Sequence, residues 1–198
     1  MAINVITEDR ASGAQVIDGS LKFDGGYLTR TPTSAGNRRT FTWSAWIKRS
    51  DLSSRSAVWG AGTTNGSGNP GGSMYFDTSS GTFRVVNGGG TVFSHVTSGN
   101  HRDTGWYHIV VAIDTTQSTS SERITIYING EKATSSGTIA SEDFQLDYNN
   151  TIIHAIGTRT DDGSLPSSIF NGHMSQVYLI DGLALGPGYF GFTDPLTN

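Results

Sequence analysis

A retaining glycoside hydrolase needs two carboxylates about 5 Å apart, and a strand supplies them when acidic residues recur at alternate positions. The acidic residues of this chain do not recur in that way. Glu142 and Asp143 are adjacent, Asp161 and Asp162 lie in a polar stretch, and Glu122 has no second acid two or four residues later. The spacing predicts that the protein is not an enzyme and leaves β-glucan hydrolysis as a remote alternative.

The histidines are spaced too widely for the usual zinc sites. The chain has no His-Glu-x-x-His motif and no Gly-x-Ser-x-Gly motif that would mark a nucleophilic serine. We therefore expect the histidines to be surface residues, or strand residues with satisfied hydrogen bonds. They are His95, His101, His108, His154 and His173.

Calcium binding depends on oxygen donors in loops, and the chain offers four candidates, Asp77, Asn149, Asp161 and Asp162. None of them belongs to an EF-hand loop. Asp and Asn in loops commonly form hydrogen-bonded turns through their own side chains. We expect turn roles for these residues, so no cofactor is assigned and calcium stays an open alternative.

Aromatic residues beside polar loops are the best candidates for ligand contacts. Sugars stack their C–H faces on aromatic rings, while nearby amides and carboxylates take the hydroxyls. Trp59, Tyr75 and Phe93 flank the long polar loops and are the predicted glycan-binding residues. The alternative is that their alternating positions place them in the core, as we expect for Trp43 and Trp106.

The elements that must position these residues are β-strands, and residues 40–49 and 106–114 show the clearest alternation. The second of these segments is apolar on both faces, which predicts a central strand. Asn129-Gly130 predicts a tight hairpin, because both central residues of a type I′ turn need positive φ. The first segment has one apolar face, made of Phe41, Trp43, Ala45 and Ile47.

Composition and length favour one β-sandwich domain. The chain has 198 residues, of which 15% are charged and 26 are glycine, as is typical of short strands joined by many turns. We predict an all-β fold in which about eleven to thirteen strands form two antiparallel sheets, packed as a jelly-roll sandwich. Residues 21–193 would form the sandwich, with an extended N-terminal arm (1–20) and a C-terminal tail (194–198).

Charge and hydropathy exclude several partners. A net charge of −4 gives no basic field for nucleic acid. No run of about 18 apolar residues predicts membrane insertion, and the N-terminus lacks the basic and apolar regions of a signal peptide. With no cysteine, there is no disulfide framework. We expect a protein made in the cytoplasm without an export signal.

Several segments together resemble the laminin-G-like, or concanavalin-A-like, jelly-roll domains of tailed bacteriophage structural proteins, including those of marine phages and cyanophages. The matching segments are residues 21–28, 41–49, 106–111, 126–130 and 170–185, and the phage character comes from residues 28–40 and 191–196. The resemblance implies a virion component. In longer relatives the domain lies within a larger tail or capsid-associated protein.

These observations lead to one main function and one alternative. The main prediction is a non-enzymatic virion structural or decoration protein of capsid or tail. Its partners would be other virion proteins, further copies of itself in a homo-oligomer, and surface glycans that aid attachment. The alternative is a dedicated carbohydrate-binding adhesion module. In that case Trp59→Ala or Tyr75→Ala should remove saccharide binding and leave the fold intact.

Overall fold

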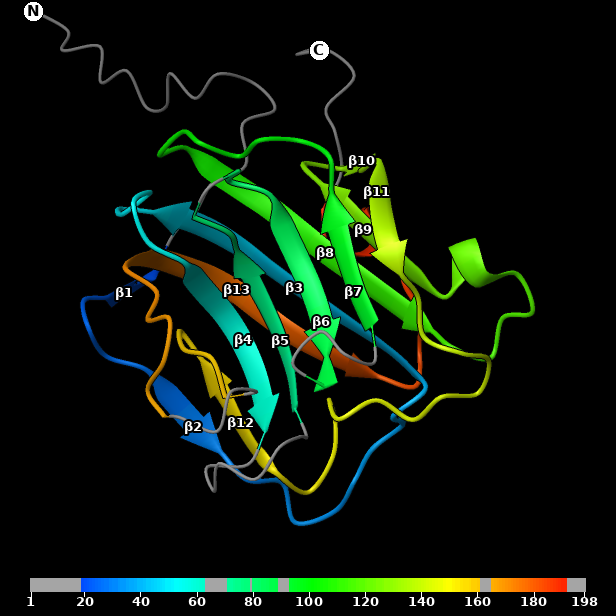
Figure 1. The fold of residues 1–198 in the computed structure, drawn as a ribbon. Helices are drawn as coiled ribbons and strands as arrows, with labels where there is room; N and C mark the ends of the chain where they lie inside the picture. The colour runs from blue at the N-terminus through cyan, green and yellow to red at the C-terminus, as the bar shows by residue number, and fades with distance from the viewer. Residues whose placement is uncertain (1–18, 63–70, 79, 89–92, 161–164, 192–198) are drawn as a thin grey trace, which may run out of the picture.

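The computed structural model describes residues 19–62, 71–78, 80–88, 93–160 and 165–191, and these form two packed antiparallel sheets (Figure 1). The predicted all-β sandwich is therefore confirmed. The predicted arm and tail lie almost wholly outside the described residues. Within those residues the helical turns, η2 (Ser120–Glu122) and η3 (Pro187–Tyr189), are three residues each, and none is long and apolar enough to cross a membrane.

Sheet A has six strands and sheet B has seven. In spatial order, sheet A contains β1 (Leu21–Phe23), β13 (Gly172–Asp181), β3 (Thr40–Arg49), β8 (Trp106–Asp114), β9 (Ile124–Ile128) and β10 (Glu131–Lys132). Sheet B contains β11 (Ser135–Thr138), β7 (Phe93–Thr97), β6 (Phe83–Asn87), β5 (Gly71–Phe76), β4 (Ser56–Gly62), β12 (Ile153–Ile156) and β2 (Leu28–Arg30). The described strands total thirteen, within the predicted range.

The core lies between the sheets, and strand alternation builds it as predicted. The apolar face of β3 is almost fully buried, and its members are Phe41, Trp43, Ala45 and Ile47. Strand β8 lies between β3 and β9, which confirms its predicted central position. The hairpin is also confirmed: Asn129 and Gly130 have φ of 52° and 86°, and Glu131 pairs with Ile128 across the two-residue turn.

The outer face of sheet A is covered by residues 182–191, which explains why β8 is apolar on both sides. The hydroxyl of Thr42 donates to Leu183 O at 2.6 Å and accepts from the Leu185 N–H at 2.7 Å. Phe190 then stacks on Tyr178, with ring centroids 6.1 Å apart. Residues 182–191 thus pack on the outer face of sheet A.

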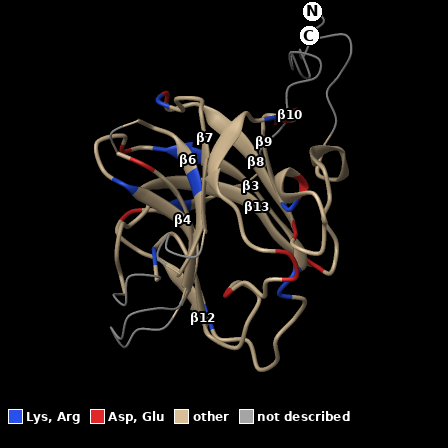
Figure 2. Ribbon diagram, turned by 45° about the vertical axis from the view of Figure 1, so that its right-hand side comes forward, with Lys and Arg blue, Asp and Glu red and all other residues tan. Residues whose placement is uncertain are grey.

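The outer face of sheet B is partly covered by residues 157–160 and 165–170. The Ala57 N–H donates to Ser168 O at 2.9 Å, and Ala57 joins Tyr75 and Val86 in a small buried cluster outside the main core. Figure 2 shows basic and acidic residues interspersed over both sheets. The part of the chain that the structure describes therefore carries no continuous basic stripe.

Candidate functional site

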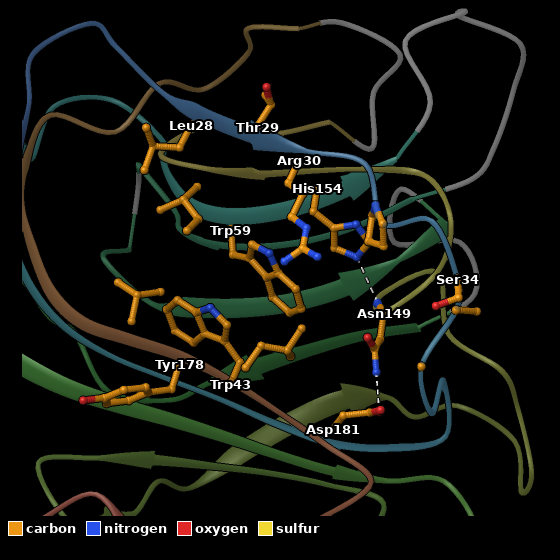
Figure 3. Close-up of a pocket in the computed structure, with 16 residues that line it drawn as sticks. Leu28, Thr29, Arg30, Ser34, Trp43, Trp59, Asn149, His154, Tyr178 and Asp181 are labelled. Carbon is orange, nitrogen blue, oxygen red and sulfur yellow. Dashed lines mark hydrogen bonds between the residues drawn. The ribbon is translucent and has the colours of Figure 1, made fainter.

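A pocket of about 490 Å³ opens between the two sheets where both have short or partly unpaired edges (Figure 3). We call it the inter-sheet pocket. Strands β2 and β12 form one side and β13 the other, with β3 and β4 behind. Its lining residues are Leu28, Thr29, Arg30, Pro32, Ser34, Ala35, Gly36, Trp43, Trp59, Asn149, His154, Ile156, Val177, Tyr178, Leu179 and Asp181.

An irregularity in β13 leaves this side of the sandwich open. The register of β13 against β3 shifts between Ser175 and Tyr178, and Gln176 has a positive φ of 49°. Strand β1 pairs only with the first residues of β13, so among the described residues no strand pairs with the second half of β13 on that side. Leu179, which pairs with the core residue Trp43, is therefore 41% exposed.

The inner wall of the pocket is aromatic. Trp43 and Trp59 stack with centroids 6.2 Å apart and planes 7° apart. Trp59 also stacks on Tyr148 at 4.8 Å and meets His154 at 5.8 Å. Both indoles line the cavity yet are only 1% and 4% exposed, so they form a fixed floor that belongs to the core.

The polar rim is a hydrogen-bonded network centred on Asn149. Its backbone N–H donates to His154 Nε2 at 3.0 Å, and its side-chain amide donates to Asp181 Oδ1 at 2.6 Å (Figure 3). The same carboxylate oxygen accepts the Asn37 N–H at 2.6 Å. Asn149 adopts a φ of 57°, which this short polar side chain tolerates. The network ties β12, β13 and the loop after β2 into one rim.

His154 is held neutral by its surroundings. Nε2 accepts a hydrogen bond, so the ring proton lies on Nδ1, which donates to Ile152 O at 2.9 Å. Burial lowers the pKa of His154, and the nearby positive charge of Arg30 lowers that pKa further. Both ring nitrogens are therefore used within the protein, and the imidazole forms an uncharged part of the pocket wall.

Stability is expected to fall as the pH drops below about 6.5, the unfolded histidine pKa. Burial lowers the pKa of His95, His101, His108 and His154, so at mildly acidic pH the unfolded chain binds more protons than the folded one. Their contribution is complete above pH 6.5 and is lost toward the folded pKa values. Urea unfolding at steps from pH 7.5 to 5 measures this, and a flat profile would contradict it.

The sequence-predicted glycan residues do not form one surface. Phe93 is fully buried in the main core, while Tyr75 faces the opposite side of sheet B, with Arg55 and Arg159 over its ring at 4.8 and 5.4 Å. Trp59 reaches the pocket only as part of its floor. The grouping of these three was therefore wrong, because alternation sends Tyr75 outward and the other two inward. The expectation that Trp106 lies in the core was wrong: Trp106 is half-buried on the outer face of sheet A, because its neighbour Tyr107, opposite Ile47, takes the inner face.

The calcium candidates are also separated. The carboxylate of Asp77 pairs with Arg84 at 2.9 Å and Arg55 at 3.7 Å, so two cations already occupy its surroundings. Asn149 belongs to the pocket rim, and Asp161 and Asp162 lie outside the described residues. Among the described residues no three His, Cys, Asp or Glu side chains gather as metal ligands. The four calcium candidates therefore do not form one site among the described residues, and Asp77 is ion-paired with two arginines.

The expectation of satisfied hydrogen bonds is confirmed for His108 but only half met by His95, whose Nδ1 is buried without a partner among the described residues. His108 Nε2 lies 3.0 Å from Ser44 Oγ, and His95 Nε2 lies 2.7 Å from Ser135 Oγ. Sequence reasoning missed Arg30 and Asp181 as pocket residues. Neither stands in a recognisable motif, and only the packing of sheet B, which carries Arg30 on β2, against sheet A, which carries Asp181 on β13, places them on opposite sides of one pocket.

The sequence of the chain, like its two-sheet sandwich, points to a known family. A sequence profile of the concanavalin A-like lectin/glucanases superfamily, of the laminin G type, matches residues 22–186. The chain belongs to this superfamily. No curated protein matches it in sequence, so the family is defined by the profile and by the fold.

Several solved structures are similar to this chain in fold, although their sequence identity to it is low. The NanB sialidase from Streptococcus pneumoniae, as its K499G mutant, has a TM-score of 0.61 and 18% identity over 89% of this chain and 28% of that chain. The CBM40 of the Ruminococcus gnavus IT-sialidase has a TM-score of 0.54 and 12% identity over 80% and 89%. Mouse laminin alpha1 domains LG4-5 have a TM-score of 0.57 and 12% sequence identity, and the match covers 83% of this chain and 42% of that chain.

These likenesses establish the fold and no more. The chain spans little more than a quarter of the NanB sialidase, 28% of its length. The activity of that whole enzyme is therefore not carried over by the resemblance. The family and the fold together show that the chain has a lectin-like fold.

Proposed function

We propose that this protein binds a saccharide in the inter-sheet pocket. The observation that carries the proposal is the combination of a rigid aromatic floor with a pre-formed polar rim. Pockets of about 300–1,000 Å³ with apolar walls and a few convergent polar groups are typical small-ligand sites. Leu28 and Leu179 line the pocket and are 50% and 41% exposed, so they offer an apolar surface for the C–H face of a sugar above the buried indoles, and Asn149 and Asp181 offer partners for its hydroxyls.

The fold comparison supports the same class of function. The Ruminococcus gnavus CBM40 has also been solved bound to alpha2,3 sialyllactose, with 12% identity to this chain and a TM-score of 0.54. That domain and this chain share the sandwich, and 88% of the domain is covered. Carbohydrate binding is thus the use of this fold that the similar structures favour.

We propose binding without cleavage. Among the pocket-lining residues that the structure describes, Asp181 is the one carboxylate. Retaining and inverting glycosidases both need two. Its Oδ1 accepts two hydrogen bonds from the rim, which favours a structural part over proton transfer. Incubation with β-glucans and sialosides, followed by detection of reducing sugar, tests this proposal, and any release of sugar would overturn it.

A virion role is the wider setting that we propose, and it rests on the phage character of residues 28–40 and 191–196. In that setting the protein decorates a capsid or tail, associates with other virion proteins and with itself, and uses the pocket to hold surface glycans. Copurification with particles and the oligomeric state in sedimentation test this setting. A monomer that is absent from purified particles would leave the saccharide-binding proposal standing alone.

Filling the pocket entrance is expected to weaken saccharide binding by about tenfold or more without unfolding the protein. Ala35 is exposed and lines the pocket, so Ala35→Trp places a large ring at the entrance and removes no core contact. A glycan array with and without a chelator first identifies the ligand, and titration calorimetry then compares the variants.

Thr33→Trp is the matched control. Thr33 is exposed in the same loop but does not line the pocket, so this variant is expected to bind as the wild type does. Equal loss in both variants would place the binding site elsewhere. The absence of signal for the wild type on every saccharide of the array would overturn the proposed function.

A further inference from the structure

We infer that the inter-sheet pocket selects an acidic sugar, a unit whose carboxylate pairs with Arg30. The inference deepens the proposed function and rests on it. It starts from the position of Arg30 on β2, the edge strand of sheet B, where it pairs with His154 of β12. Leu28 pairs with Ile156 two residues away on the same face.

The side chain of Arg30 is directed into the pocket. Trp59 and His154 lie on the inner face of sheet B, as their ring contact at 5.8 Å shows. Because Arg30 is opposite His154, alternation gives it the same face. Figure 3 shows its guanidinium beside the Trp59 and His154 rings, at the wall of the cavity. The charge thus borders the aromatic floor.

Arg30 is unpaired where the other described arginines are not. Arg38, Arg55, Arg84 and Arg123 form ion pairs, and Arg39 and Arg49 donate to backbone carbonyls. Arg102 and Arg159 have interactions of their own. Within the part of the chain that the structure describes, the side chain of Arg30 has neither a hydrogen bond nor an ion pair, and only its backbone is paired, with His154. Its five donors are therefore available to a ligand.

The other charged group of the pocket lies across the cavity on β13. Asp181 forms no ion pair with Arg30 and is instead held by Asn37 and Asn149 at 2.6 Å each. His154 is neutral through its two hydrogen bonds. The pocket therefore has one positive side and one negative side, and this polarity orients a bound ligand.

A sugar carboxylate fits this polarity better than any neutral group. A guanidinium binds a carboxylate through two parallel N–H···O bonds, which gives both strength and geometry. With its carboxylate at Arg30, a pyranose ring would lie against the exposed side chains of Leu28 and Leu179, above the buried indole floor. Its hydroxyls would donate to Asp181, since a carboxylate accepts hydroxyl hydrogens and repels an anion. Uronic acids have this arrangement of one anionic end and several hydroxyls.

The test compares matched acidic and neutral sugars. Methyl glycosides of glucuronic, galacturonic and mannuronic acid are titrated against those of glucose, galactose and mannose, with binding followed by ligand-observed NMR. For at least one pair the acidic sugar should bind about 10- to 100-fold more tightly, as expected for a charge-assisted hydrogen bond. The difference should shrink as the salt concentration rises, because the pocket is open to solvent.

Arg30→Met should abolish the preference and retain the weaker neutral binding, while Lys132→Met, which removes one charge from an exposed residue of β10, should change nothing. Equal binding of acidic and neutral sugars by the wild type, or a preference that survives Arg30→Met, would overturn the inference and leave the proposed function intact. Failure of the wild type to bind any sugar, acidic or neutral, would overturn both.

Discussion

Trp59→Ala is expected to lower the free energy of unfolding by about 3–5 kcal/mol, the usual cost of truncating a buried tryptophan. Trp59 is 4% exposed and contacts three aromatic rings besides that of His154. It stacks on Trp43 and Tyr148, and it meets the edge of Phe41 at 6.4 Å. Truncation would leave a cavity that this rigid cluster cannot fill, because its rings are anchored on β3 and by the Tyr148 hydroxyl bond to Val86 O.

Denaturant unfolding of wild type and variant, compared at equal m-value, measures the loss. Trp106→Ala is the control, because Trp106 is only half-buried on the outer face of sheet A and meets a single ring, His173, at 6.5 Å. The Trp106→Ala variant should lose less than half as much free energy of unfolding as the Trp59→Ala variant. A midpoint for Trp59→Ala equal to that of the wild type would show that the aromatic cluster is not a rigid part of the core.

This expectation reverses one sequence-based prediction. From the sequence, Trp59→Ala was expected to remove saccharide binding with the fold intact. In the structure Trp59 serves the core and the pocket at once, so loss of binding in that variant would follow from either cause. The rim residues Ala35 and Arg30 separate the two, because each lines the pocket while remaining exposed.

The fold follows from short-range patterns that a sequence displays directly. The alternation of residues 40–49 and 106–114 predicts two strands, their burial and, for the second, a central position. The Asn129-Gly130 dipeptide predicts a turn that needs nothing beyond its own backbone. Such features depend on neighbours a few residues apart, and the structure agrees with each of them.

The site depends on features that are not local. Arg30 meets His154 because β2 pairs with β12, more than a hundred residues later. Leu179 reaches the pocket because of the register shift within β13. The segments that pack on the outer faces of sheets A and B have the sequence character of loops. Burial of Tyr75 depends on residues 157–160 and 165–170, which lie over sheet B and which no periodicity indicates.

Gly172→Ala is expected to cost roughly 2–6 kcal/mol, the sum of backbone strain and overpacking. Gly172 has a φ of +151°, where L-residues are strained. A Cβ there would lie 2.1 Å from Lys48 O, 2.8 Å from Phe170 Cζ and 3.0 Å from Arg49 Cα. Two of these atoms are backbone of β3, so the methyl group can be admitted only if β13 moves away from β3.

The position of Gly172 makes that movement costly. It pairs with Phe23 of β1 on one side and Arg49 of β3 on the other, so three strands meet there. Phe170, fully buried, packs edge to face on Phe23 at 5.7 Å. Displacing β13 would loosen that contact and the long β13–β3 ladder, which also carries Leu179 and Asp181 into the pocket. Loss of stability should therefore be accompanied by loss of saccharide binding.

Gly26→Ala separates this effect from a general intolerance of substituted glycines. A Cβ at Gly26 meets no atom within 4 Å, and its φ lies outside the left-handed region, so its stability should stay within about 0.5 kcal/mol of the wild type. Thermal and urea unfolding of both variants measure the difference. If Gly172→Ala also stayed within that margin, the close approach of β13 to β3 would be wrong, and with it the geometry that places Asp181 opposite Arg30.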